Sequence, residues 1–527
     1  MRERRLTKVV GWKGAIGPRR PRRAVVLGAA VLAVAGLAGQ VVGLPAAHAR
    51  IAPAPVAERQ PNILIIVADD LGFGDVGFNG ASVPTPNIDR IAQMGMVLDH
   101  FYVSALCSPS RAGLLTGRYP NRFGIMGDTI TPGSDFGLDP KEETIAQVLA
   151  RAGYARRSFL GKWHLGHRSA AFHPMNFGFT SFYGHYNGAI DYFTHKRESV
   201  VDWHRDRSPS ADQGYSTDLL SDEAVRIIKT PSPGGKPWMM WLAYNAPHGP
   251  FQATEQDLKA VGFDPTKPRY GGPTGDGGPE GPDYGQRGHG NTRRQTALAM
   301  IHGLDRGIGR VLDTLEATGQ LNNTIIFFTS DNGGPGTDHA ADPPSSTAPL
   351  RGWKFQHYEG GVRVAAAMAW PARLKPRARA DVGPISYVDV LPTLAHLAHA
   401  TSNRQLDGQD MSAALLSERK LKGDRVLFMG EDYRIAPAYG ERGPGGRDFL
   451  RGRAASAMIG RWKLVGAELY DVEADPTEKH DVAAQHPDVV ARIMKRAKAF
   501  EALRKISRDR LNATHLPPLP LWELPKR

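Results

Sequence analysis

Three stretches of the chain are apolar at almost every position, namely 63–68, 238–244 and 324–330. Such continuous runs predict strands that are buried on both faces of a parallel sheet. Segments with the apolar spacing of helices lie between and after these runs, at 87–94, 144–151, 294–317 and 387–397. This alternation predicts an α/β fold, with a large, mixed but mostly parallel sheet that is flanked by helices.

Each of the three runs is followed by polar residues. Asp69 and Asp70 follow the first, His248 lies between two prolines after the second, and the third ends in Asp331 and Asn332. Open α/β sheets place their sites at the carboxyl ends of strands, so we expect these side chains to converge. Carboxylate and amide oxygens suit Ca²⁺ or Mg²⁺, whereas zinc favours His or Cys. A solvated turn is the alternative interpretation of the adjacent aspartates.

Cys107 is the only cysteine among 527 residues, which excludes an intrachain disulfide. It opens the stretch Cys107-Ser108-Pro109-Ser110-Arg111, which runs on to Gly117. We expect a helix with Ser108 as its cap, Pro109 in its first turn and Gly117 at its end. Cys107 then lies at a helix N-terminus that favours anions, with the guanidinium of Arg111 one turn further in. A buried, inert thiol is the alternative, but these neighbours favour a functional site.

Two further stretches carry candidate chemistry. Gly161-Lys162-Trp163-His164-Leu165-Gly166 follows an apolar segment, and residues two apart on an extended chain point to the same side. Lys162 then suits an oxyanion donor and His164 a proton shuttle. Lys354 lies between glycine-rich turns and, judged alone, is equally typical of a surface charge.

The Cys107 stretch, with Leu115-Thr116-Gly117 behind it, resembles the Cys-x-Pro-Ser-Arg…Leu-Thr-Gly signature of type I sulfatases. Gly161 to Gly166, Pro247-His248-Gly249-Pro250 and Arg351 to Arg363 also resemble blocks of that family, and the likeness spans roughly residues 60 to 500. One departure is Ala365, where many relatives have proline; we expect it to affect the entry of a strand rather than the chemistry.

The resemblance implies an alkaline phosphatase-like fold and an arylsulfatase-type enzyme that hydrolyses sulfate monoesters. It implies that Cys107 is oxidised to formylglycine (3-oxoalanine) by a formylglycine-generating enzyme, and that the hydrated aldehyde is the nucleophile. The implied ligands of Ca²⁺, with Mg²⁺ as the alternative ion, are Asp69, Asp70, Asp331, Asn332 and the modified Cys107. The implied catalytic side chains, besides Cys107, are Arg111, Lys162, His164, His248 and Lys354.

The implied roles divide among these residues. Arg111 holds the nucleophile in place, and Asp331 accepts the proton of the attacking hydroxyl. His164 then takes a proton from the second hydroxyl of the hydrate, which expels sulfate. Lys162, His248 and Lys354 neutralise the sulfuryl oxygens and the departing alcohol. The substrate is a sulfated small molecule or a glycan, and the sequence does not distinguish aryl, steroid and carbohydrate sulfates. The alternatives are a phosphonate or phosphate monoester hydrolase of the same superfamily and an inactive protein that binds sulfated glycans.

The formal net charge of +13 is concentrated at the start of the chain. Residues 1–25 carry +8 and residues 26–49 carry no charged side chain, which leaves +5 for the rest. No basic patch with interleaved aromatic residues is present, so nucleic acid is not a predicted partner. The basic region, the apolar run 24–37 and the triplet Ala47-His48-Ala49 predict a signal peptide over 1–49, cleaved after Ala49.

This leader predicts transfer by an export machinery to the periplasm or the extracellular space. The paired arginines are compatible with twin-arginine export, but arginine is common throughout the leader, and the sequence does not distinguish this route from Sec export. A membrane anchor is the alternative. The remaining predicted organisation is a linker at 50–60, a catalytic domain at 61–400 with a Gly/Pro-rich insertion at 262–290, a C-terminal α+β subdomain at 401–505 and a Pro-rich tail at 506–527. The sequence gives no indication of the oligomeric state.

Overall fold

The structure is a computed structural model that describes residues 59–125, 129–132, 134–197, 199–270, 287–336, 342–376, 379–380, 382–417, 420, 425–430 and 455–503. The predicted signal peptide, most of the linker, the middle of the insertion and the tail lie outside the described residues. The described residues all belong to one unit of the chain, Glu58–Arg527.

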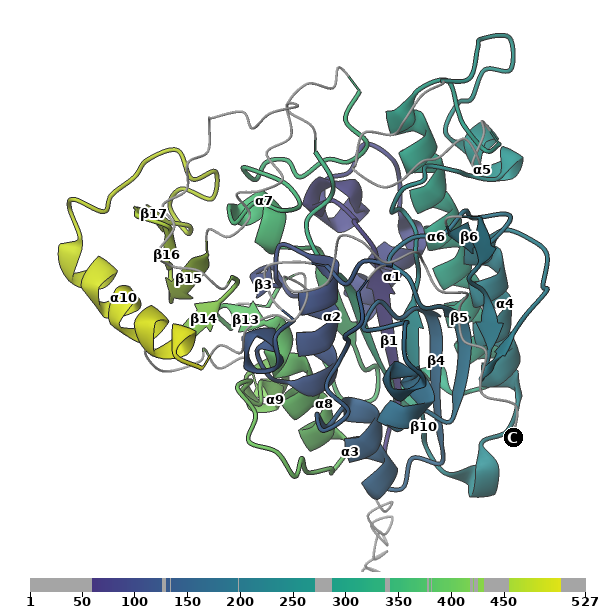
Figure 1. Ribbon diagram of the computed structural model, residues 1–527, viewed down its shortest axis with the longest axis horizontal. Helices are drawn as coiled ribbons and strands as arrows, with labels where there is room; N and C mark the ends of the chain where they lie inside the picture. Colours follow the sequence, from purple (N-terminus) through teal and green to yellow (C-terminus); the bar gives the residue numbers. More distant parts are fainter. Residues whose placement is uncertain are drawn as a thin grey trace, which may run out of the picture. The chain divides into compact units, whose positions relative to one another are not determined.

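Within the described residues, a nine-stranded sheet forms the centre of the fold (Figure 1), in the order β2-β12-β11-β1-β10-β4-β5-β8-β9. Its middle strands are β11 (Thr324–Ser330), β1 (Asn62–Ala68), β10 (Trp238–Ala243), β4 (Arg156–Lys162) and β5 (Ser181–His185), and each is parallel to its neighbours in this group. The outer pairings of β11 with β12 (Ala366–Ala369) and of β5 with β8 (His204–Arg205) are antiparallel. The predicted mixed, mostly parallel sheet is thus confirmed.

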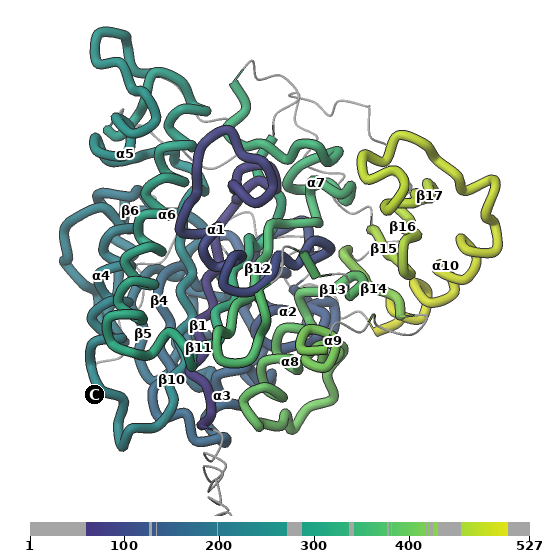
Figure 2. Tube along the Cα trace, turned by 180° about the vertical axis from the view of Figure 1, so that it is seen from behind, coloured from purple at the N-terminus to yellow at the C-terminus, as the bar shows by residue number. Residues whose placement is uncertain are grey.

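Alternate side chains of the central strands pack on opposite helical layers. Ile63 and Ile65 lie in one apolar core with α2 (Cys107–Thr116), α3 (Ile145–Arg151) and α8 (Val390–Leu397). Leu64 and Ile66 lie in the other with α1 (Pro86–Met94), α4 (Ser216–Lys229) and α6 (Arg293–Ala317). The two layers flank the sheet in Figure 2. Because both faces are covered, the strands are apolar at successive positions.

The other elements are short. They include β2 (Met96–Val97), β3 (Phe101–Tyr102), β6 (Lys196–Arg197), β7 (Val200–Val201), β9 (Ser208–Pro209), α5 (Glu255–Ala260), α7 (Glu359–Val362), β13 (Ile385–Ser386), the 3₁₀ turn η8 (Tyr387–Asp389) and α9 (Ser412–Ser417). The expected helix at 387–397 therefore begins as a 3₁₀ turn before it continues as α8.

Helix α2 is buried along its whole length. Its C-terminal end agrees with the prediction, but its N-terminal end does not. Gly117 ends the helix with φ of 65°, a left-handed conformation that glycine adopts without strain. The prediction that Ser108 caps the helix was wrong, because the helix begins at Cys107 and its N-cap is Leu106. The Ser108 hydroxyl instead donates to the carbonyl of His164 (3.0 Å) and accepts from the N–H of Ile130 (3.1 Å).

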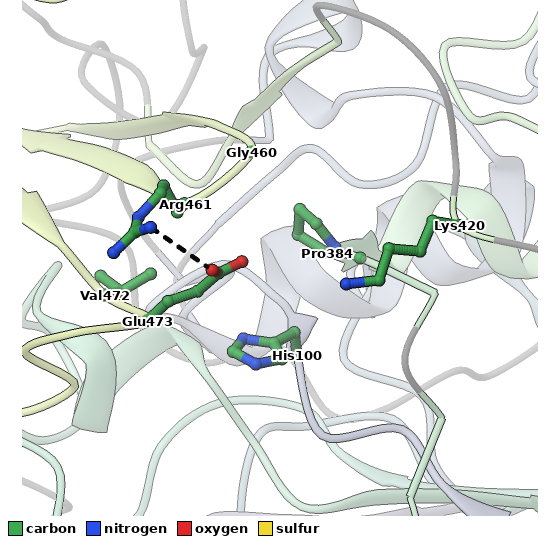
Figure 3. A pocket seen from close by; sticks show the side chains of 8 residues that line it. His100, Pro384, Lys420, Gly460, Arg461, Val472 and Glu473 are labelled. Carbon is green, nitrogen blue, oxygen red and sulfur yellow. Dashed lines mark ion pairs between the residues drawn. The ribbon is translucent and has the colours of Figure 1, made fainter.

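A separate antiparallel sheet lies in the C-terminal part. It consists of β14 (Val426–Phe428), β15 (Ser456–Ile459), β16 (Trp462–Val465) and β17 (Glu468–Asp471), and α10 (Pro487–Glu501) packs against it. An apolar cluster with Met458 and Val465 on one side and Tyr102 and Val362 on the other joins this sheet to the part of the chain that contains the central sheet. A small cavity of about 160 Å³ lies at the same junction, between His100 and the Gly460–Arg461 turn (Figure 3).

No helix among the described residues combines the length and the apolar character needed to cross a bilayer.

Candidate active site

Four neighbouring strands end at the same edge of the sheet, and each delivers polar side chains there. The strands β11, β1, β10 and β4 are adjacent and parallel, in that order. The residues at or just beyond their carboxyl ends are, in the same order, Asp331 with Asn332, Asp69 with Asp70, His248 and Lys162. The structure therefore brings together side chains that lie far apart in the sequence, as the three apolar runs had led us to expect.

Asp70 is the centre of a buried hydrogen-bond network. Nζ of Lys354 donates to its Oδ2 (2.8 Å), and Nδ2 of Asn332 donates to its Oδ1 (2.7 Å). Nε2 of His248 lies 3.5 Å from Oδ2. Burial acts to raise the pKa of the Asp70 carboxyl, but Lys354 and His248 outweigh it and hold that pKa below its ordinary value. The φ angle of 65° at Asp70 is unfavourable for a non-glycine residue and is typical of a functional site.

The pKa of Asp69 is shifted in the opposite direction from that of Asp70. Nζ of Lys162 donates a hydrogen bond of 2.5 Å to its Oδ2, and Nη2 of Arg111 is 3.7 Å from the same atom. Burial and the negative charge of Asp331 nevertheless raise the pKa of the Asp69 carboxyl to about 8. Its protonated form therefore persists at neutral pH unless a further cation binds beside it.

Cys107 and His164 face each other inside the protein. Sγ of Cys107 lies 3.2 Å from Nδ1 of His164, whose Nε2 lies 3.0 Å from the carbonyl oxygen of Ile130. A carbonyl oxygen only accepts, so Nε2 carries the proton and Nδ1 presents a lone pair to position 107. Burial, together with the charges of Lys162 and Arg111, holds the pKa of His164 well below its ordinary value, which keeps the ring neutral.

Burial also raises the pKa of the Cys107 thiol. The thiolate is the nucleophilic form of a cysteine, so a raised pKa makes the unmodified side chain a poor nucleophile at neutral pH.

Arg111 links helix α2 to two of the strand ends. Its Nε donates to Oδ2 of Asp331 (2.8 Å), and its Nη1 donates to the carbonyl oxygen of Lys162 (2.9 Å). Only 1 % of Arg111 is exposed, so these contacts are shielded from water. The helix that carries Cys107 is thereby fixed against β11 and β4.

The open side of the site lies near His248 and Lys354. Their side chains are 15 % and 8 % exposed, whereas those of Lys162 and Asp69 are 0 % exposed. Burial and the charge of Lys354 hold the pKa of His248 well below its ordinary value, despite the attraction of Asp70. A substrate therefore meets the permanent charge of Lys354 and a histidine that is neutral at rest.

The strand ends fit a divalent cation. Oδ1 of Asp69 and Oδ1 of Asn332 are buried without a hydrogen-bond partner, which is rare for buried polar atoms. Both are hard oxygen donors, and the carboxylates of Asp70 and Asp331 lie beside them. Asp69, Asp70 and His248 also place ligand atoms within 4.8 Å of one another. The residues present thus match the oxygen-rich site that the sequence predicted, with His248 as a neighbour that the prediction had assigned to catalysis alone.

One local prediction about this site was wrong. Lys162 is the last residue of β4, and His164 lies beyond the strand with φ of 55°. The two side chains therefore reach the site through a bend in the backbone, rather than through the side-to-side alternation of an extended segment.

Sequence reasoning missed a second group of buried charges behind Lys354. Glu359, Lys463 and Glu478 are each 0 % exposed and lie in contact with one another. One signal was present in the sequence, because Lys463 directly precedes the apolar pair Leu464-Val465.

Comparisons with known proteins agree with this geometry. The sequence model of the sulfatase family matches residues 61–400. Arylsulfatase A of Homo sapiens is 32% identical over 468 residues, which cover 82% of this chain and 86% of that protein. N-acetylgalactosamine-6-sulfatase of Mus musculus is 31% identical over 396 residues, which cover 71% of this chain and 69% of that protein. The crystal structure of Ps i-CgsB in complex with k-i-k-neocarrahexaose has a TM-score of 0.71 and 28% identity, over 85% of this chain and 94% of that chain.

The central sheet, with its polar strand ends and the helix that carries Cys107, defines an alkaline phosphatase-like hydrolase. The matched family narrows the class to the hydrolases of sulfuric esters. The chain belongs to the sulfatase family.

Proposed function

We propose that the protein is an exported sulfatase that hydrolyses sulfate monoesters to an alcohol and inorganic sulfate, with formylglycine at position 107 and calcium at the strand ends. The observation that carries this proposal is the buried contact of 3.2 Å between Sγ of Cys107 and Nδ1 of His164. It places a neutral proton acceptor against the side chain whose modification the family resemblance implies, in a site that also contains Lys162 and Lys354.

Two groups complete the site. The ligands of calcium would be Asp69, Asp70, Asp331, Asn332 and the modified side chain at 107. Bound there, the ion would lower the pKa of the nucleophilic hydroxyl and counter the charge of the sulfuryl oxygens. The hydrated aldehyde of formylglycine would supply the oxygen nucleophile and a route for the release of sulfate. The unpaired oxygens of Asp69 and Asn332 support the metal, and Mg²⁺ is the alternative ion.

The side chains of the chain itself then have separate tasks. Nδ1 of His164 accepts a proton from the group at position 107. Lys162 and Lys354 donate hydrogen bonds to the sulfuryl oxygens and to the departing alcohol oxygen, where negative charge increases as the S–O bond of the ester breaks.

His248 lies on the open side of the site and, once protonated, gives a proton to the departing alcohol oxygen. The carboxylate of Asp70, 3.5 Å away, stabilises the imidazolium form. Over one turnover, water supplies the oxygen and the protons that balance the two products.

We infer that the substrate class is a sulfated carbohydrate or another sulfated small molecule. The similarity to N-acetylgalactosamine-6-sulfatase and to Ps i-CgsB, which was crystallised with k-i-k-neocarrahexaose, favours the carbohydrate. We also propose that the leader directs export with cleavage after Ala49, and that a formylglycine-generating enzyme acts on Cys107. N-terminal sequencing of the secreted protein tests the cleavage site.

The function is tested by comparing kcat/KM for 4-nitrophenyl sulfate and for an aryl phosphonate ester, with enzyme from a host that performs the modification. Preference for the sulfate supports the proposal. Faster hydrolysis of the phosphonate contradicts it and favours the phosphonate hydrolase. Tight binding of sulfated glycans without hydrolysis favours the inactive binding protein. Mass spectrometry of the peptide that contains Cys107 completes the test, because an intact cysteine in active enzyme excludes the formylglycine mechanism.

A further inference from the structure

Lys354 is carried by a closed loop. The N–H of Gly360 donates to the carbonyl oxygen of Arg351 (2.7 Å), which joins the two ends of the segment around Lys354. The N–H of Lys354 donates to the carbonyl oxygen of Gly334 (3.1 Å). The loop therefore has a defined shape, and it presents Nζ of Lys354 to Asp70.

Both ends of this loop contact a single residue of the C-terminal part, Glu478. Nη1 of Arg351 donates to the backbone carbonyl oxygen of Glu478 (2.7 Å). The N–H of Glu359 donates to the side-chain Oε2 of Glu478 (2.6 Å). Glu478 itself has φ of 51°, a conformation that costs a non-glycine residue free energy unless its surroundings impose it. Glu478 thus holds the loop on the side opposite to the strand ends.

Lys463 of β16 completes the contact. Its Nζ donates to Oε1 of Glu359 and to Oε1 of Glu478, both at 2.9 Å. The hydroxyl of Tyr102 donates to the second oxygen of Glu359 (3.0 Å). Glu359, Lys463 and Glu478 are fully buried, so the contacts among them are shielded from water. Few other arrangements of these three side chains have an equally low free energy.

We propose that Glu478 and Lys463 are positioning residues, through which the C-terminal sheet sets the place of Lys354 relative to Asp70. This inference rests on the proposed role of Lys354 at the sulfuryl group. If Glu478 only stabilised the C-terminal sheet, its replacement would lower stability without any specific dependence on Lys354.

A double-mutant cycle separates these two roles. The variants are Glu478→Gln, Lys354→Met and their combination, and the measurements are kcat and KM for 4-nitrophenyl sulfate. We expect Glu478→Gln alone to lower kcat/KM by about 10-fold to 100-fold, chiefly in kcat, because small displacements of a catalytic group are costly. In the Lys354→Met background we expect the same change to have less than about a threefold effect, since residues that act as a unit are not additive. Equal effects in both backgrounds would overturn the proposal.

Glu473→Gln is the matched control. Glu473 follows β17 at the same end of the C-terminal sheet and lies 3.9 Å from Nη1 of Arg461, at the solvent-exposed cavity of Figure 3. The substitution makes the same chemical change at a carboxylate outside the loop contact, and we expect wild-type kcat and KM.

Arg351→Met is a second variant for the case that Glu478→Gln does not fold. It removes the contact at the other end of the loop, and Arg351 is exposed, so the fold is expected to tolerate it. A similar loss of kcat/KM in Arg351→Met supports the proposal if the substitution has no such effect in the Lys354→Met background. A wild-type enzyme that hydrolyses neither 4-nitrophenyl sulfate nor a sulfated carbohydrate contradicts the proposed function itself. An active wild type in which Glu478→Gln and Arg351→Met retain full kcat/KM contradicts only the positioning role.

Discussion

Nε of Arg111 donates a hydrogen bond of 2.8 Å to Oδ2 of Asp331, and Nη2 of the same guanidinium lies 2.7 Å from that oxygen. The two side chains are 2 % and 0 % exposed. The pair joins helix α2, which carries Cys107, to the strand end that carries Asp331 and Asn332. Loss of either partner therefore leaves an uncompensated charge at the centre of the site.

Arg111→Met is expected to lower the free energy of unfolding by about 3–5 kcal/mol, because it leaves Asp331 buried without its partner. Urea denaturation in calcium-free buffer measures the change. Arg90→Met is the control, because Arg90 pairs with Asp313 and Glu316 at the surface and such pairs contribute about 0–1 kcal/mol. Similar losses in the two variants would contradict the structural importance of the Arg111 pair.

Cys107→Ala is expected to abolish sulfate ester hydrolysis and to leave the fold intact. The change removes one buried sulfur atom and none of the carboxylates, cations or strand contacts of the site. Circular dichroism and urea denaturation check the fold, and release of 4-nitrophenol checks the activity. Turnover at the wild-type rate in this variant is incompatible with a nucleophile derived from Cys107.

Calcium is expected to stabilise the folded protein, by about 2.7 kcal/mol when its free concentration is 100 times Kd. Because the pKa of Asp69 is raised to about 8, binding below that pH displaces a proton, and the affinity should rise by about tenfold per pH unit between pH 6 and 8. Urea denaturation with and without calcium measures the stabilisation, and isothermal titration calorimetry at several pH values measures the affinity.

Asp69→Asn tests this interpretation of calcium binding. The substitution is nearly isosteric but removes one carboxylate, so we expect calcium to bind at least about tenfold more weakly and without the steep pH dependence. Asp475→Asn changes a carboxylate of a turn in the C-terminal part and serves as the control. An unchanged pH slope in Asp69→Asn would show that another group supplies the proton.

Acid is expected to destabilise the protein partly through His185. Burial lowers the pKa of this histidine to about 3, and its Nδ1 lies 3.0 Å from the carbonyl oxygen of Asn187. In the unfolded chain the residue takes up a proton near its ordinary pKa of about 6.5, so the unfolded state binds more protons below that pH and stability falls as the pH decreases. At pH 5.5 the loss from this residue alone is about 1.4 kcal/mol.

The measurement is the free energy of unfolding between pH 7 and 5.5. We expect the free energy of unfolding to fall less steeply with decreasing pH in His185→Gln, by the contribution of one titrating group. The surface substitution His480→Gln is the matched control. A decline of the same steepness in His185→Gln would mean that His185 is already protonated in the folded state.

The strands that build the site are evident in the sequence because they are covered on both faces. Ile63 to Val67 alternate between two apolar cores, so no polar residue interrupts the run until Asp69 marks its end. The apolar residues of β10 and β11 alternate between the same two cores, although Thr329 and Ser330 precede Asp331 in β11. The polar residues at these ends were therefore identifiable as candidate ligands and catalytic groups before their distances were known.

Contacts that depend on distant parts of the chain were not predictable in this way. Local preference predicts that Ser108 caps the helix. Its hydroxyl instead donates a hydrogen bond to the carbonyl oxygen of His164, which lies 56 positions away in the sequence. Lys463 forms a hydrogen bond with Glu359, which lies 104 positions away in the sequence. No local sequence pattern predicts the partner of a single buried lysine. The bend that turns His164 toward Cys107 likewise depends on the neighbouring β5 segment, whose Tyr186 carbonyl accepts the His164 N–H.

The burial of helix α2 restricts when its first residue is accessible to another enzyme. All ten residues from Cys107 to Thr116 are buried, and Cys107 itself is 1 % exposed. A modifying enzyme has to take the cysteine and its neighbours into its own active site, which the folded chain does not permit. Under the proposed mechanism, conversion of Cys107 to formylglycine therefore has to precede folding, and a chain that folds first keeps its thiol. The specific activity of a preparation is then decided by competition between two rates during biosynthesis, so that slower expression, or more of the modifying enzyme, yields a larger active fraction.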